Sequence, residues 1–179
     1  MGAARNKKWI VRLSGLWLAL ATAHASVDLG IDVLSSQDYS LLKGKRVGLI
    51  TNQTGVNAAG TKTRLLLKRH CNLVALYSPE HGLDGTEKAG RYVRSRRDRL
   101  TGLIASSLYG PTRKPTPAML RGIDLLVFDL QDIGCRSYTY ISTLGLCMEA
   151  AGENNIPFVV LDRPNPVGGL RIEGPSVEP

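Results

Sequence analysis

A carboxylate and an imidazole stand side by side in this sequence, just after an apolar stretch. Glu80 and His81 follow the run LVALY (residues 73–77) and a Ser-Pro pair, and a glycine-rich turn comes next. A carboxyl group that is partly removed from water has a raised pKa and can donate a proton as a general acid. An adjacent imidazole can tune that pKa or orient a hydroxyl group. Glu80 is therefore our candidate general acid and His81 a candidate binding residue. A salt-bridged loop glutamate and a packing or capping histidine are the alternatives.

Three other apolar runs end in the same manner, in LITNQTG, VFDLQDIG and VVLDRPNP. An arginine at such an end can clamp an anionic group with two hydrogen bonds. The alternative for Arg136 and Arg163 is pairing with Asp132 or Asp162. A tyrosine can stack on a ligand, although we expect one of Tyr138 and Tyr140 to lie in the core. The candidate binding residues at these ends are Asn52, Gln131, Asp132, Arg136, Tyr138, Asp162, Arg163 and Asn165.

A second carboxylate would be needed for most acid–base chemistry beside Glu80. Glu173, in the segment RIEGP, is the first candidate for this second carboxylate, and Asp162 is the second candidate. The alternative for Glu173 is a structural role. Asp129 lies just before the end of its apolar run, so a structural role is as reasonable for it as a functional one.

The elements that must position these residues follow one rhythm along the chain. Strands rich in apolar and β-branched residues alternate with short helical patterns, which predicts βαβ units and a mostly parallel sheet with helices on both faces. All strand ends of a parallel sheet lie on one edge, where α/β proteins bind ligands, so we expect a site there. The expected strands are 45–53, 71–78, 103–110, 123–132 and 156–166, and the expected helices are 61–70, 116–122 and 140–155.

Two of the helices carry more detailed signals. Thr116 is the expected N-cap of its helix because Pro117 follows at the first helical position. In the last helix the spacing places Ile141, Leu144, Met148 and Ala151 on one buried stripe.

The first 25 residues look like a secretory signal peptide. A basic segment precedes the apolar run LSGLWLALATA, and Ala23-His24-Ala25 fits a cleavage site. The alternative, an uncleaved membrane anchor, would call for a longer apolar run. The segment holds four basic and no acidic residues, so its removal lowers the net charge from +8 to +4. We therefore expect an exported protein, periplasmic or extracellular, without nucleic-acid partners and without stable membrane insertion after cleavage.

The remaining 154 residues, 26–179, suit one domain. Cys71, Cys135 and Cys147 show no CxxC spacing, so neither a zinc site nor a disulfide scaffold is indicated. Two alternatives stay open for the three cysteines: one disulfide bridge with one free thiol, or three buried free thiols. The segment GVNAAGTKT departs from the phosphate-loop pattern, GxSxG does not occur, and no metal-ligand pattern is evident. We expect no metal and no cofactor.

Five segments in order resemble the bacterial exo-β-N-acetylmuramidase family: GLITNQTG, SPEHGLDG, SLYGPTRKPTPAML, DLLVFDLQDIGCRSYTYISTL and VLDRPNPVGGLRIEGP. The resemblance implies a Rossmann-like, three-layer α/β domain that carries the cleft, here residues 26–179. It also implies a smaller C-terminal domain, which we expect to be absent from this chain because the sequence stops in the linker. The implied activity is release of N-acetylmuramic acid from the non-reducing end of peptidoglycan fragments, so the implied partners are peptidoglycan-derived sugars.

Glycoside hydrolysis fits the candidate residues. It needs a proton donor, here Glu80, and usually a second carboxylate, here Glu173, although an N-acetyl sugar can use its own acetamido group as the nucleophile. Arg136 or Arg163 would clamp the lactyl carboxylate of muramic acid. The alternative is a non-catalytic module that binds muramyl sugars or the cell wall. The stereochemical course and the oligomeric state stay open.

Overall fold

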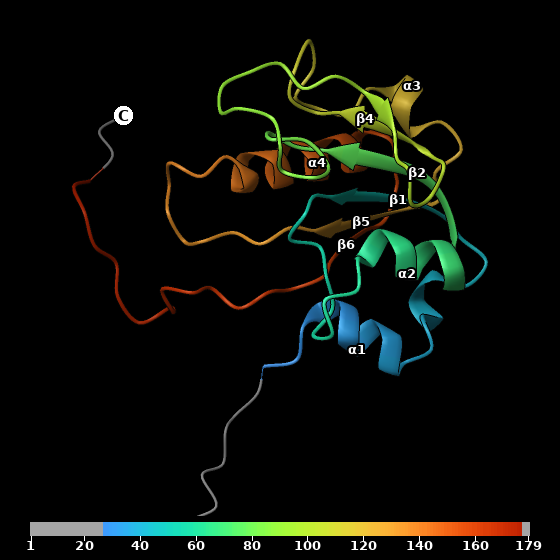
Figure 1. Cartoon of the computed structure of the whole chain (residues 1–179), viewed down its shortest axis with the longest axis horizontal. Coiled ribbons are helices and arrows are strands. Elements are labelled where there is room, and N and C mark those ends of the chain that lie inside the picture. The colour runs from blue at the N-terminus through green and yellow to red at the C-terminus, as the bar shows by residue number, and fades with distance from the viewer. Residues whose placement is uncertain (1–26, 177–179) are drawn as a thin grey trace, which may run out of the picture.

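A single six-stranded sheet forms the centre of the molecule (Figure 1). The computed structural model describes residues 27–176, so the predicted signal peptide lies outside the described residues. The strand order across the sheet is β3-β4-β2-β1-β5-β6. The strands are β1 (Arg46–Thr51), β2 (Asn72–Ser78), β3 (Arg96–Arg97), β4 (Ile104–Ser107), β5 (Leu125–Asp129) and β6 (Phe158–Val160).

Every pairing in the sheet is parallel except that of the short edge strand β3 with β4. The chain moves outward from β1 through β2 to β4, and then continues on the other side of β1 with β5 and β6. Between β1 and β5 the direction of winding reverses, and a doubly wound sheet opens a crevice at the carboxyl ends of such strands. The register pairs Thr51 with Asp129, so these two strands end at the same level. The predicted α/β class with a mostly parallel sheet is confirmed.

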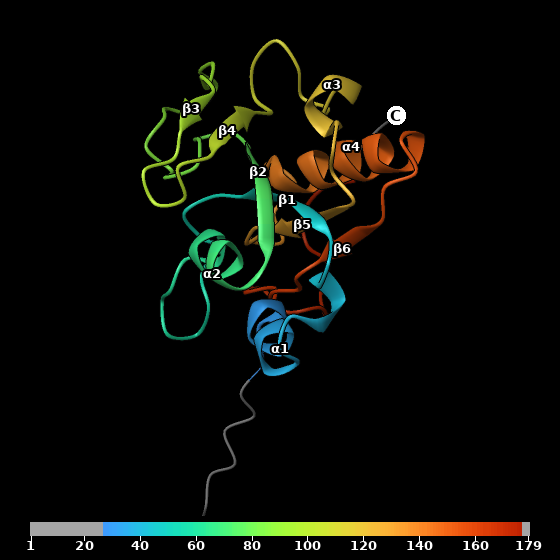
Figure 2. The same ribbon diagram turned by 90° about the vertical axis from the view of Figure 1, so that its right-hand side faces the viewer.

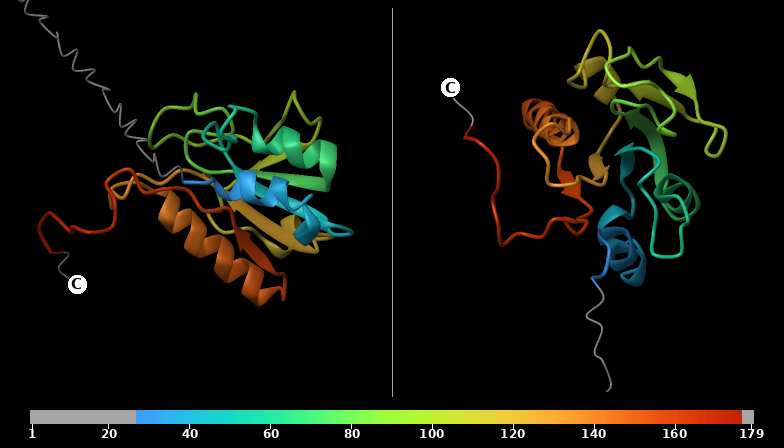
Figure 3. Two further views of the ribbon diagram at one scale, coloured as in Figure 1. Left: turned by 90° about the horizontal axis from the view of Figure 1, so that it is seen from below. Right: turned by 60° about the vertical axis from the view of Figure 1, so that its left-hand side comes forward.

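Helices cover both faces of the sheet and give three layers (Figures 2 and 3). Helices α1 (Gly30–Ser36) and α2 (Thr63–His70) pack on one face, through Ile31, Leu34 and Leu67. Helices α3 (Pro117–Leu120) and α4 (Tyr140–Glu153) pack on the other face. The predicted cap of α3 is present, because the Thr116 side chain accepts a hydrogen bond from Met119 N at 3.3 Å. None of the helices described for residues 27–176 has the length and apolar character of a membrane span.

The buried face of α4 differs from the predicted stripe. Ala151 is buried and Leu144 packs against the core, as predicted, but Ile141 and Met148 are 57% and 51% exposed, and Tyr140, Thr143 and Cys147 are buried instead. The buried stripe is therefore displaced by one position along the sequence. Small side chains at Cys147 and Ala150 let the helix pack closely on the sheet, and this closeness offsets the loss of burial at the larger residues.

Two helical segments and one strand lie where no element was predicted: α1, the short 3-10 helix η1 (Ser40–Leu42) and β3. Helix α1 begins against the end of β6, where Gly30 N donates to Asp162 O at 2.9 Å. A Cβ atom at Gly30 would lie only 2.5 Å from Asp162 N, so this approach requires glycine.

The three cysteines are all free thiols, so the alternative with one disulfide bridge is not what the structure shows. Cys147 is buried, Cys71 is half-buried and Cys135 is exposed. The alternative with three buried thiols is therefore wrong for Cys135.

Candidate active site

Glu80 lies at the carboxyl end of β2, in a turn that follows Pro79. The residue is only 7% exposed, yet it lines a hollow of about 250 Å³. We call this cavity the Glu80 hollow; its other lining residues are His81, Ala89, Tyr109, Ser137, Tyr138, Thr139 and Tyr140. Tyr140 is buried and Tyr138 packs edge-on against it at 4.9 Å between ring centroids, so one tyrosine of the pair belongs to the core, as expected.

The turn that carries Glu80 is held from the outside. Arg64, which is 3% exposed, donates to Asp84 Oδ1 at 2.7 Å and to Leu83 O at 3.4 Å. On the other side, the Gln53 amide packs so closely on Gly85 that a Cβ atom there would lie 2.4 Å from its Cδ. These contacts fix the backbone around Glu80 before any ligand binds.

Both carboxylate oxygens of Glu80 accept hydrogen bonds. Oε1 accepts from Gly90 N at 2.7 Å and Oε2 accepts from Thr139 Oγ1 at 2.8 Å. Burial raises the pKa of Glu80, but the donors at Gly90, Thr139 and Tyr109, with His81 nearby, together outweigh burial and leave the pKa below its usual value. The sequence predicted a raised pKa from desolvation alone. The structure corrects that prediction because it supplies donors from two distant loops.

His81 adopts a backbone conformation that is rare for residues other than glycine. Its φ is +66°, and Gly82 follows with a φ of +76°. Nδ1 lies 2.8 Å from Glu87 O, and since a carbonyl oxygen can only accept, Nδ1 carries a proton. In the neutral imidazole Nε2 therefore has a free lone pair. A strained residue that lines a cavity is a candidate for function.

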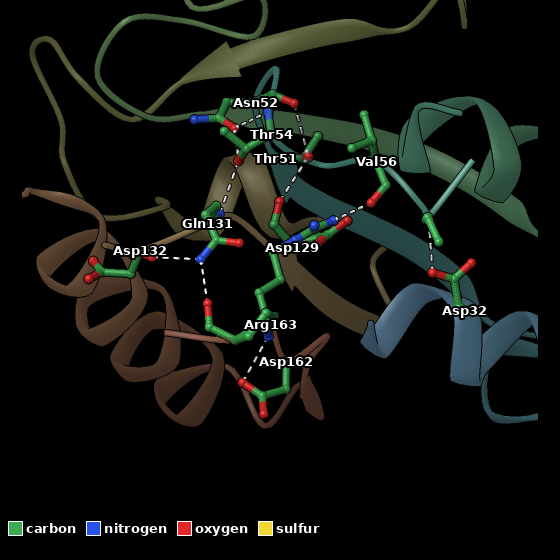
Figure 4. A network of polar contacts seen from close by, with 12 residues as sticks. Asp32, Thr51, Asn52, Thr54, Val56, Asp129, Gln131, Asp132, Asp162 and Arg163 are labelled. Atoms are coloured by element: carbon green, nitrogen blue, oxygen red, sulfur yellow. Dashed lines mark hydrogen bonds and ion pairs between the residues drawn. The ribbon is translucent and has the colours of Figure 1, made fainter. Parts of the chain in front are cut away.

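A hydrogen-bond network joins the ends of β1 and β5 (Figure 4). Asn52 Oδ1 accepts from Thr54 N at 2.8 Å and from Thr54 Oγ1 at 2.6 Å. Thr54 Oγ1 in turn accepts from Gln131 N at 3.0 Å. Asn52 is fully buried, and only the Oδ1 of its amide is bonded within the loop, because its Nδ2 has no hydrogen-bond partner among the described residues.

Arg163 also belongs to this network rather than to an open cleft. Its Nε lies 2.6 Å from Asp129 Oδ1, and its Nη2 donates to Val56 O at 2.8 Å (Figure 4). The expected aspartate partners were Asp132 or Asp162. The Arg163 guanidinium is therefore already paired, whereas the other candidate anion clamp, Arg136, is exposed.

The other candidates gather away from Glu80. A separate hollow of about 170 Å³ between β5 and β6 is lined by Asp132, Asp162, Arg163 and Asn165, among others. Gln131 borders this side, because its Nε2 donates to Pro164 O at 2.9 Å. Glu173 is exposed in the extended segment 164–176, which runs away from the sheet (Figure 1). The predicted convergence of all strand ends on a single hollow is thus not what the structure shows.

Some residues around Glu80 were not found from the sequence. Gly90, Tyr109 and Thr139 all lower its pKa. Gly90 and Thr139 lie outside the predicted strands, and Tyr109 lies near the end of the predicted strand 103–110. The block SLYG that contains Tyr109 was the one available signal, because it ends the strand next to β2. Within residues 27–176 no cluster of three or more His, Cys, Asp or Glu side chains could hold a metal ion.

Known proteins resemble this chain in sequence and in fold. The family described as exo-β-N-acetylmuramidase NamZ, N-terminal, matches residues 47–179. The peptidoglycan β-N-acetylmuramidase NamZ of Bacillus subtilis (strain 168) is 53% identical over 155 residues, which are 86% of this chain and 37% of that protein.

Two crystal structures of DUF1343 family proteins from Bacteroides fragilis NCTC 9343 are also similar. One is 58% identical with a TM-score of 0.76, and the matched region is 84% of this chain and 38% of that chain. The other has a TM-score of 0.62 at 32% identity, with 79% and 36% covered. This chain therefore spans less than two fifths of the length of each of these three relatives.

Proposed function

This chain belongs to the exo-β-N-acetylmuramidase NamZ N-terminal family, and we propose that it acts in a glycoside hydrolase that releases N-acetylmuramic acid from the non-reducing end of peptidoglycan fragments. The observation that carries the proposal is the buried Glu80 carboxylate in a cavity with three tyrosines, at the carboxyl edge of a parallel sheet. Tyrosine faces and hydroxyls suit a sugar ring, which is apolar on its faces and polar at its rim. Export, which the predicted signal peptide indicates, would bring the site to this substrate.

In this proposal Glu80 is the general acid, and Oε2 is the oxygen that carries the proton. Gly90 N–H can only donate, so Oε1 stays an acceptor in every protonation state. Oε2 faces the Thr139 hydroxyl, which can turn to accept instead. A sugar that displaces water from the hollow would raise the Glu80 pKa towards the value a proton donor needs.

The second catalytic group is open to two assignments. Among the described residues that line the Glu80 hollow, Glu80 is the only acid. This favours the acetamido group of the substrate as the nucleophile, a route known for N-acetyl sugars. Glu173 stays the protein-based candidate, but it would have to approach from the extended segment 164–176. Arg136 is our candidate for the lactyl carboxylate, because it is exposed in the loop that leads to Tyr138.

The direct test is hydrolysis of a chromogenic β-glycoside of N-acetylmuramic acid by the full chain, with the matching N-acetylglucosamine glycoside as the control. The proposal expects release from the first substrate only. Release from the glucosamine compound alone would overturn the substrate assignment. Binding of muramyl ligands without release from either compound would favour the alternative function, a non-catalytic module that holds muramyl sugars.

A further inference from the structure

A second hollow adjoins the Glu80 hollow and is so far without a role. It has a volume of about 180 Å³ and is lined by Gly90, Tyr92, Tyr109, Gly110 and Arg113. We call it the Tyr92 hollow. None of these residues was a candidate from the sequence, because they lie in the loops on either side of β3 and β4 rather than at the ends of central strands.

Glu80 lines the first hollow and is hydrogen-bonded to a residue that lines the second. Tyr109 lines both cavities, and it also contributes to the lowered pKa of Glu80. Gly90 lines the Tyr92 hollow, and its N–H donates to Glu80 Oε1 at 2.7 Å. A ligand that spans both hollows would therefore pass the carboxylate at the junction of its two parts.

The walls of the Tyr92 hollow suit a sugar ring. Tyr92 is 54% exposed although it is aromatic, and its ring rests on Gly110 so closely that a Cβ atom there would lie 2.2 Å from its Cε2. The Arg113 guanidinium stacks 4.1 Å from the centroid of the Tyr109 ring. Together they offer a held aromatic surface and several N–H donors, the groups that bind the faces and hydroxyls of a carbohydrate.

The two hollows differ in depth. The Glu80 hollow is lined in part by Tyr140, which is 3% exposed, whereas Tyr92 and Arg113 of the Tyr92 hollow are exposed and its Tyr109 is half-buried. Small-molecule sites typically measure about 300–1,000 Å³. Each of these two hollows is smaller than this range, whereas their volumes taken together fall within it. The deeper hollow suits a chain end, and the open one suits the unit that continues towards solvent.

We propose that the Tyr92 hollow binds the leaving-group sugar, the unit on the reducing side of the bond that is cut. This inference rests on the proposed glycosidase function. A proton given by Glu80 must reach the oxygen between two sugars, and Glu80 lines the first hollow and is hydrogen-bonded to a residue that lines the second. Tyr92 and Arg113 are then specificity residues for the second sugar and do not touch the first.

The test compares two substrates that share the first sugar. One is the disaccharide of N-acetylmuramic acid β-linked to N-acetylglucosamine. The other is the β-fluoride of N-acetylmuramic acid, whose leaving group is one atom and cannot fill the Tyr92 hollow. For Tyr92→Ala and for Arg113→Ala, kcat/KM on the disaccharide should fall by about tenfold, while kcat/KM on the fluoride stays within about twofold of the unsubstituted chain. Arg91→Ala is the matched control, since Arg91 is exposed and lines neither hollow.

Parallel losses on both substrates, or no loss on the disaccharide, would overturn the inference while the proposed function stands. A chain that turns over neither substrate would instead count against the proposed function. In that case the inference is tested by calorimetric binding of the disaccharide and of free N-acetylmuramic acid, because a binding measurement needs no turnover. Tyr92→Ala should weaken only the disaccharide, and equal weakening of both ligands would refute the inference.

Discussion

Asp129 and Arg163 form a buried ion pair that joins the end of β5 to the loop after β6. Arg163 Nε lies 2.6 Å from Asp129 Oδ1, and the two side chains are 6% and 0% exposed. The pair fixes the spacing of two strand ends at the edge where the site lies, and Thr51 Oγ1 donates to Asp129 O at 3.0 Å from β1.

Removal of the Arg163 side chain should destabilise the fold, because it leaves the buried Asp129 carboxylate without its ion-pair partner. We expect Arg163→Ala to lower the free energy of unfolding by about 3–5 kcal/mol. Urea denaturation measures the change. Lys43→Ala is the control, since Lys43 pairs with Asp38 at the surface and exposed ion pairs contribute little. Equal effects of the two substitutions would contradict a structural role for the buried pair.

Glu80→Gln should abolish turnover and keep binding. The amide preserves the shape of the side chain but cannot donate a proton to a leaving oxygen, so kcat should fall by about 10³-fold. Steady-state hydrolysis of N-acetylmuramic acid β-linked to N-acetylglucosamine, whose leaving oxygen needs a proton, measures the loss of turnover. Calorimetric binding of free N-acetylmuramic acid measures binding. Glu87→Gln, an exposed glutamate nearby, serves as the control. Full activity of the Glu80 variant would exclude Glu80 as the acid.

Thr139→Val should raise the pKa of Glu80, because it removes the hydroxyl that donates to Oε2 at 2.8 Å. The pKa of Glu80 is lowered in the folded protein, so this carboxylate stabilises the fold above its unfolded pKa, and the stabilisation is lost as pH falls through the folded pKa. In the variant the stabilisation should be smaller, and its loss should be complete at a higher pH. Carbon NMR of the Glu80 carboxyl during a pH titration reports the shift. Ser137→Ala is the control, since Ser137 contacts Cys135 instead, and an unchanged Glu80 pKa in Thr139→Val would show that the Thr139 contact is without effect.

A second pH effect is expected at the start of β1. Asp124 accepts hydrogen bonds from Arg46 N at 2.8 Å, Nε at 3.0 Å and Nη2 at 2.8 Å, and these bonds hold its pKa far below the usual range. The pair should therefore stabilise the fold above about pH 4, the unfolded value, and progressively less as pH falls further. Asp124→Asn should unfold at lower urea concentration at neutral pH, and the difference should shrink in acid. A difference that grows in acid would reverse the sign of this linkage.

The thiols should react in a definite order. The side chain and backbone of Ser137 lower the pKa of the exposed Cys135, whereas burial raises the pKa of Cys71 and raises that of Cys147 to about 12. Since the thiolate is the reactive form, a maleimide should modify Cys135 first, Cys71 more slowly and Cys147 only on unfolding. Mass spectrometry of peptides over time measures the order. Early labelling of Cys147 would show that α4 opens in the folded protein.

The strands and helices were largely predictable because their apolar patterns are strong. The run Leu125–Asp129 is buried at every position, as a central parallel strand should be. Helix α1 and strand β3 were missed, since a seven-residue helix and a two-residue strand carry little periodic signal. The face of α4 was predicted only in part: Ala151 is buried as expected, whereas Tyr140 and Cys147 are buried in place of Ile141 and Met148.

The site was predictable only where strand ends supply it. Glu80 and His81 were found in this way, but the donors at Gly90, Tyr109 and Thr139 come from loops whose paths no local pattern encodes. The expectation of one shared hollow failed for a geometric reason. In the order β2-β1-β5-β6, β6 is three strand spacings from β2, about 14 Å, so their end residues face different cavities.

The left-handed backbone at His81 limits which residues can ever replace it. A β-branched side chain is strongly disfavoured there, while asparagine, aspartate and glycine fit the conformation. Only a few residue types can therefore be accepted at position 81, independently of the chemistry that the imidazole performs. A library of variants at codon 81, sorted only for folded protein, should be enriched in Asn and Gly and depleted of Val and Ile. Such a result separates the requirement of the backbone conformation from any requirement for the imidazole.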